Sequence, residues 1–131
     1  MRAQDFFAKA SRAAASAKML LDAGDADGAC SRAYYAMFDA ARAALLASGA
    51  PVQPEVAKTH SGLISAFSLH LVKTGRVAAE LGKALNRAGQ LRLVADYKGD
   101  PIEAEDAAWV VSQADVFVAA MQDTFMPKAS K

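Results

Sequence analysis

The chain of 131 residues is long enough for one domain with a single hydrophobic core. Its 15 lysines and arginines stand against 14 aspartates and glutamates, for a net charge of +1, so any affinity for phosphate has to come from a local cluster rather than from the overall field. No apolar run approaches the roughly 18 residues that span a bilayer, and the lone Cys30 excludes an internal disulfide, so we expect a cytoplasmic protein without a membrane partner.

Apolar residues recur at spacings of three and four along most of the chain, which predicts α-helices, and no alternation of useful length predicts a strand. The expected fold class is therefore all-α, an up-down bundle of about five helices. A single domain over residues 1–126 is expected to precede a flexible C-terminal tail at 127–131. The helices are expected over residues 5–22, 25–48, 59–73, 78–97 and 101–125.

Prolines and glycines mark the breaks between these helices. The segment GAPVQPEVAKT, residues 49–59, has two prolines and little periodicity, which predicts a loop. The last helix has the clearest start, because Asp100 suits the N-cap, Pro101 the first helical position and Glu103 the capping box.

The segment SRAYYAMFDAARAALL, residues 31–46, has two distinct faces. On its polar face, Arg32, Tyr35, Asp39 and Arg42 fall within an arc of roughly 80° when each residue turns about 100°. This row is either a solvated face with loose ion pairs or a binding groove, since guanidinium groups beside an aromatic ring suit an RNA backbone or a nucleotide. The opposite face is predicted to be buried and consists of Cys30, Ala33, Tyr34, Met37, Phe38, Ala41, Ala44 and Leu45.

The sequence offers little for metal or covalent chemistry. Two histidines and one cysteine, with no CxxC, HxxxH or ExxH spacing, are too few for a zinc or di-iron site, and no glycine-rich phosphate loop or GxSxG motif occurs. We therefore expect no metal and no cofactor. His60 lies in line with the apolar positions of the third helix, which favours a partly buried, hydrogen-bonded structural histidine over a catalytic base.

Three motifs, in this order, resemble the HEPN-domain family in its small stand-alone bacterial and archaeal form. They are Arg-Ala-Tyr-Tyr-Ala from Arg32, Thr-His-Ser-Gly from Thr59 and Arg-x-x-x-Asp-Tyr from Arg92. The resemblance covers nearly the whole chain. It implies a helical bundle that forms homodimers, frequent pairing with a minimal nucleotidyltransferase in toxin–antitoxin systems and, in many members, a metal-independent ribonuclease activity.

Active members of that family carry an arginine followed after four to six residues by a histidine, which meets its symmetry mate between subunits. Here Arg92 is followed by four residues and then Tyr97. A phenol with a pKa of about 10 is a poor base at neutral pH beside an imidazole near 6.5. Arg92 also lies on an apolar stripe, so its charge needs a partner, which is either Asp96 one turn later or a bound phosphate.

The last helix indicates a dimer. Trp109, Val116 and Ala120 fall opposite its core stripe and form an apolar strip that a monomer leaves exposed, unless the tryptophan folds over its own neighbours.

We interpret the chain as an RNA- or nucleotide-binding protein whose partner is a nucleotidyltransferase. The expected binding residues are Arg32, Tyr35, Arg42 and Arg92. One alternative is a ribonuclease with a non-standard site drawn from Arg92, Tyr97 and His60. Another is a structural interaction module whose polar rows only keep the chain in solution.

Overall fold

The computed structural model describes residues 2–99 and 101–126, and every regular element in those ranges is helical. The predicted all-α class is therefore confirmed, while Asp100 and the tail expected at 127–131 lie outside the described residues. The elements are α1 (Ala3–Asp22), α2 (Ala26–Ser48), α3 (Pro54–Ala57), α4 (His60–Phe67), the π-helical segment η1 (Ser68–Val72), α5 (Ala79–Lys98) and α6 (Ala104–Phe125).

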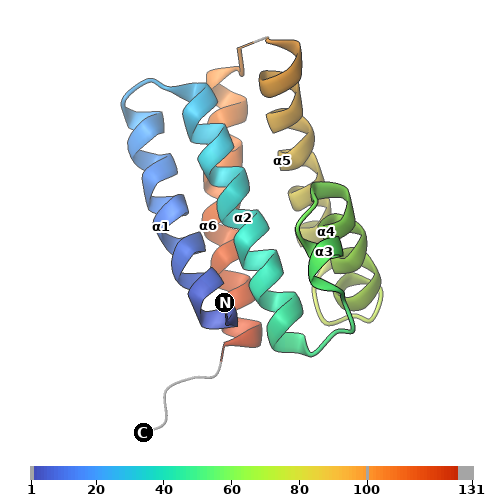
Figure 1. Cartoon of the computed structure of the whole chain (residues 1–131). Helices are drawn as coiled ribbons and strands as arrows, with labels where there is room; N and C mark the ends of the chain where they lie inside the picture. The colour runs from blue at the N-terminus through green and yellow to red at the C-terminus, as the bar shows by residue number, and fades with distance from the viewer. Residues whose placement is uncertain (1, 100, 127–131) are drawn as a thin grey trace, which may run out of the picture.

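The helix α2 is the centre of the bundle. It packs against α1 and α6, which lie beside it in Figure 1, and it also contacts α4 and α5. The short helices α3 and α4 follow α2 in the chain, and α4 touches both α2 and α5. A helix surrounded in this way has to be apolar on more than one face.

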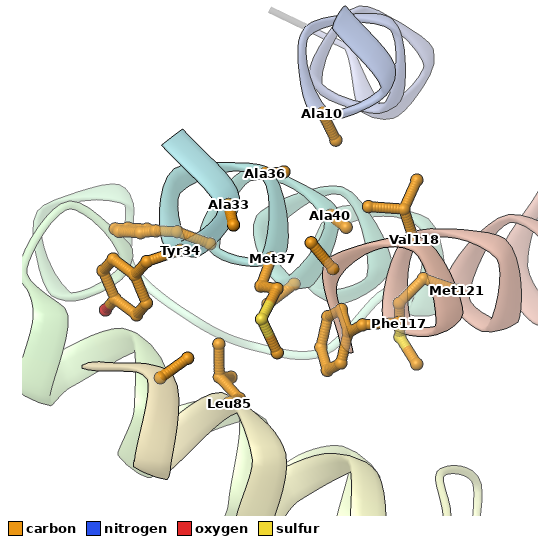
Figure 2. Packing of buried hydrophobic residues seen from close by; sticks show 14 of the residues in the cluster. Ala10, Ala33, Tyr34, Ala36, Met37, Ala40, Leu85, Phe117, Val118 and Met121 are labelled. Carbon is orange, nitrogen blue, oxygen red and sulfur yellow. The ribbon is translucent and has the colours of Figure 1, made fainter. Parts of the chain in front are cut away.

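Alanine makes this central position possible. All eight residues of the predicted core face of α2 are buried, and Ala29, Ala36, Ala40 and Ala43 are buried as well. Figure 2 shows Ala36 and Ala40 on the side of α2 that faces Ala10 of α1. Small side chains there let the two helices approach closely, while larger residues such as Met37 fill the space toward α5 and α6.

The loop predicted over residues 49–59 is wrong in part, whereas the helix predicted over 59–73 matches the helical stretch over 60–72. The loop expected at residues 49–59 contains α3, which begins at Pro54 with Gln53 as N-cap. The helix expected over 59–73 begins at His60 and widens into η1 after Phe67. Proline at the first helical position explains α3, because its missing N–H would have no partner there.

The start of the last helix was also predicted wrongly. The helix α6 begins at Ala104 with Glu103 as N-cap, and Pro101 precedes it. Ile102 is buried, and its backbone N–H donates to the Oδ1 of Asp27 at 2.8 Å. This tie to the start of α2 keeps Ile102 out of the helix that its neighbours would otherwise favour.

Within the described ranges, no helix combines the length and the apolar character that crossing a membrane requires.

Candidate functional site

His60 is the first residue of α4, in a turn that its neighbours hold in place. Thr59 is the N-cap, and its Oγ1 accepts a hydrogen bond from the N–H of Gly62 at 3.1 Å. A side chain at position 62 would collide with the carbonyl oxygen of Val56 and with Thr59. The Thr-His-Ser-Gly motif therefore fixes the first turn of α4 against α3.

Three helices meet at His60 through polar contacts. Its Nδ1 lies 2.9 Å from the Oη of Tyr34 on α2, and its Nε2 lies 2.9 Å from the Nη1 of Arg92 on α5. The Nη2 of Arg92 pairs with the Oδ2 of Asp96 at 3.0 Å. We call these four side chains, Tyr34, His60, Arg92 and Asp96, the His60 network.

The chemistry of the partners fixes where the protons lie. Burial and the Arg92 guanidinium lower the pKa of His60 below 6.5, and Asp96 opposes them, so the imidazole is neutral at pH 7. A guanidinium N–H can only donate, so Nε2 accepts and the ring proton sits on Nδ1, from which it is donated to Tyr34. Burial raises the pKa of Tyr34 to about 12, although Arg92 opposes the rise. The phenol therefore keeps its own hydrogen, which remains free to donate.

Arg92 has more hydrogen-bond donors than partners. Its side chain is only 12% exposed, and its two described partners each engage one terminal nitrogen. The Nε is buried, and no described residue accepts its hydrogen. Because a buried unpaired donor costs about 1–3 kcal/mol, an acceptor-rich group such as a phosphate would be stabilised at this point.

An aromatic wall stands beside the network. The rings of Tyr35 and Phe38 are stacked with centroids 6.3 Å apart, and the Cζ of Arg92 lies 5.1 Å from the centroid of Tyr35. The ring of His60 meets that of Phe38 edge-on at 5.2 Å. These contacts restrict both the imidazole and the guanidinium to one arrangement.

The network borders a cavity of about 450 Å³ between α4 and α5. A Cβ at Gly89 would lie 3.2 Å from the Cε1 of Tyr34, so the glycine lets the tyrosine ring reach α5. The volume falls in the range of about 300–1,000 Å³ found for small-molecule sites. Besides Tyr34, His60, Gly89 and Arg92, the cavity is lined by Ser61, Ile64, Ser65, Asn86, Gln90 and Leu93.

The structure divides the row predicted on α2. Tyr35 lies against Arg92, as described above. Arg42 instead has its Cζ 4.3 Å from the centroid of the Phe6 ring and lines a different cavity, while Arg32 is exposed. The four predicted binding residues therefore do not meet in one cavity.

Asp39 lies between the arginines of that row and is half-buried. Burial raises the pKa of its carboxyl group, and the charges of Lys9, Arg42 and Arg32 oppose the rise. No described side chain forms an ion pair with it within 4.0 Å. Asp39 therefore does not form the loose ion pair expected on a solvated face, and it interacts with the positive charges of Lys9, Arg42 and Arg32 only at longer range.

The remaining predicted site residues lie elsewhere. The side chain of Tyr97 is outside the described part of the structure. On α6, Trp109 is partly buried with the Cζ of Arg87 5.5 Å from its ring centroid, whereas Val116 is 52% exposed and Ala120 is partly buried. The homodimer expected through this strip stays a prediction.

Outside the His60 network, the described residues offer neither a reactive thiol nor a metal site. Burial raises the pKa of Cys30 to about 11, so this thiol is not a nucleophile at neutral pH. In residues 2–99 and 101–126, no group of three His, Cys, Asp or Glu side chains could hold a metal ion.

Sequence reasoning placed Tyr34 only in the core and overlooked its hydroxyl. Its burial is as predicted, but its Oη is the group that ties His60 to α2. The signal was the choice of tyrosine over phenylalanine on an apolar face, because a buried phenol needs a polar partner. The cavity residues Asn86, Gln90 and Ser65 carried no sequence signal, and Ser61 was noted only as part of the Thr-His-Ser-Gly motif.

Comparison with known proteins gives the family. The model of the HEPN domain matches residues 3–124. This chain belongs to the HEPN family. A UPF0332 protein of Gloeobacter violaceus is 37% identical over 88% of this chain and 89% of its own length. A Thermotoga maritima UPF0332 protein is 41% identical over 69% of this chain and 64% of its own length. A Methanocaldococcus jannaschii protein named as a candidate toxin is 36% identical over 69% of this chain and 63% of its own length.

In this HEPN chain an arginine and a histidine are in contact, but they are not the closely spaced pair that the family resemblance implies. Arg92 and His60 are 32 residues apart in the sequence and come from α5 and α4. The pairing is therefore a product of the tertiary fold and could not be read from spacing along one helix.

Proposed function

We propose that this HEPN protein binds single-stranded RNA or a nucleotide through Arg92 and acts in a toxin–antitoxin type system with a nucleotidyltransferase as its partner. The observation that carries the binding part is the donor capacity of Arg92: this residue lines the cavity between α4 and α5, and its buried Nε has no acceptor among the described residues. The hydroxyl of Tyr34 supplies a second uncommitted donor beside it. Donors without acceptors favour a phosphate as the bound group.

The system-level part of the proposal is supported by the relatives. Two of them, both from Methanocaldococcus jannaschii, are named as candidate toxins. The test is co-expression with the small nucleotidyltransferase expected from an adjacent gene, followed by size-exclusion chromatography of the mixture. Co-elution supports the partner, and separate elution at micromolar concentrations contradicts it.

Binding is tested by fluorescence anisotropy with a short 5′-labelled single-stranded RNA. We expect affinity to fall as salt rises, because binding releases counterions from the phosphates. Arg92→Ala should weaken binding about tenfold or more, as expected when a charged hydrogen-bond donor is removed. Arg12→Ala is the matched control, since Arg12 is exposed on α1 and does not line the cavity. If both variants lose the same affinity for RNA, the loss comes from the change in net charge alone, and the proposed site is contradicted.

A second function, ribonuclease activity, is favoured by one observation, the 2.9 Å contact of Arg92 with His60. The contact occupies Nε2, so His60 can act as a base only after a ligand has drawn Arg92 away. The length of the RNA after incubation with the protein distinguishes the two functions. RNA that stays intact supports binding alone, whereas cleavage that is lost in His60→Ala would establish the enzyme. If neither binding nor cleavage occurs, the structural interaction module is the remaining interpretation.

A further inference from the structure

The cavity between α4 and α5 carries a second set of polar groups that the His60 network does not use. Asn86 and Gln90 on α5 are exposed, as are Ser61 and Ser65 on α4. Within the described residues, none of these four side chains forms a hydrogen bond to another side chain or to the backbone. Each amide and each hydroxyl can both donate and accept, so the four offer a neutral recognition surface.

The spacing along α5 places Asn86, one member of this surface, at a distance from the charge of Arg92. Asn86 precedes Arg92 by six residues, about 9 Å along the axis at 1.5 Å per residue. Gln90 lies between them: it is four residues after Asn86 on the same helix face, and two residues, about 3 Å along the axis, before Arg92. A ligand that uses both ends of the cavity must therefore carry its anionic group and its hydrogen-bonding edge at different ends.

The charges of the cavity limit the ligand further. Among the described residues that line the cavity, Arg92 is the one that carries a charge, and its neighbour His60 is neutral. One guanidinium, already paired in part with Asp96, suits a single phosphate better than a polyphosphate. The apolar side chains of Ile64 and Leu93 lie on opposite walls, on α4 and α5, where they can contact the flat face of a base.

Building on the proposed function, we infer that this cavity holds one nucleoside monophosphate unit, with the phosphate on Arg92 and the base edge read by Asn86 and Gln90. Side-chain amides present an adjacent donor and acceptor, the pattern that pairs with the edge of a nucleobase. The same unit can come from a free nucleotide or from one residue of an RNA strand. The site therefore distinguishes bases rather than only attracting a phosphate backbone.

The test compares ligands with and without a base. Isothermal titration measures the affinity of the purified chain for AMP, GMP, CMP and UMP, and for ribose 5-phosphate, which has the sugar and the phosphate alone. We expect the best nucleotide to bind about tenfold more tightly than ribose 5-phosphate, the gain from a pair of net hydrogen bonds. Asn86→Ala and Gln90→Ala should each reduce this difference, and should reduce the preference among the four nucleotides, while the affinity for ribose 5-phosphate stays unchanged.

Gln4→Ala is the matched control, because it removes an exposed amide from α1, away from the cavity lining. A trinucleotide identifies the source of the unit: tighter binding than any mononucleotide, with the same dependence on Asn86, indicates RNA, and equal binding indicates a free nucleotide. Equal affinity for ribose 5-phosphate and all four nucleotides would overturn the inference while leaving the proposed function intact if Arg92→Ala still weakens binding. Absence of binding by every nucleotide and RNA would overturn both.

Discussion

Replacing Arg92 by methionine separates a ligand-binding role from a structural one. The variant loses the pair with Asp96, whose side chain is 40% exposed, a contact worth about 0.2–0.5 kcal/mol. It also loses the hydrogen bond to His60, about 1 kcal/mol, and the cation–π contact with Tyr35, about 0.5–1 kcal/mol. Against these losses, it removes the buried unpaired Nε, whose burial costs about 1–3 kcal/mol.

These opposing contributions predict that Arg92→Met changes the free energy of unfolding by no more than about 1 kcal/mol. Urea unfolding followed by circular dichroism measures it. Leu85→Ala is the control, because Leu85 is fully buried on the same helix and its truncation should cost about 2–5 kcal/mol. A loss above about 3 kcal/mol for Arg92→Met, as when a buried ion pair is broken, would show that Arg92 serves the fold and would refute the reasoning.

Three further predictions concern α2, His60 and α6. Phe38→Ala should destabilise the fold by about 3–5 kcal/mol because the ring is buried, whereas Arg42→Ala should cost less than about 1 kcal/mol; equal losses in thermal unfolding would contradict the assignment of the two faces. Since the pKa of His60 is lowered by folding, the unfolded chain takes up a proton near pH 6.5 that the folded chain resists. Stability should therefore fall as the pH drops below that value, and the fall should be shallower in His60→Gln; parallel pH profiles would exclude this contribution. Trp109→Glu should turn a dimer into a monomer in sedimentation velocity, and a monomeric unaltered chain would rule out that interface.

The sequence was sufficient for the elements whose formation depends on local pattern. The apolar spacing of three and four in α2 predicted the eight residues of its core face, all of which are buried, because a helix buries what its period gathers on one face. The start of α6 could not be predicted, since the bond from Ile102 to Asp27 joins residues 75 positions apart. Propensity near residue 101 carries no information about that contact.

The candidate site was predictable only in its separate parts. Arg92 was recognised as a candidate site residue because a charge on an apolar stripe needs a partner. Asp96 was one of the two partners considered, and the structure shows this ion pair. Its contact with His60 depends on how α4 crosses α5, which the spacing along either helix does not determine. The same limit applies to Arg42, which shares a face of α2 with Tyr35 yet lines another cavity because α1 brings Phe6 over it.

The most direct test of the account observes the Nε–H of Arg92 itself. In ¹⁵N-labelled protein the arginine Nε–H signals are recorded by NMR, and the one that disappears in Arg92→Met is assigned to Arg92. The account predicts that titration with the best-binding nucleoside monophosphate or a short single-stranded RNA shifts this signal and slows its exchange with solvent, because the buried donor acquires an acceptor. A signal from Arg92 that stays unchanged at saturation, while those of other arginines move, would contradict the claim that this residue holds the phosphate.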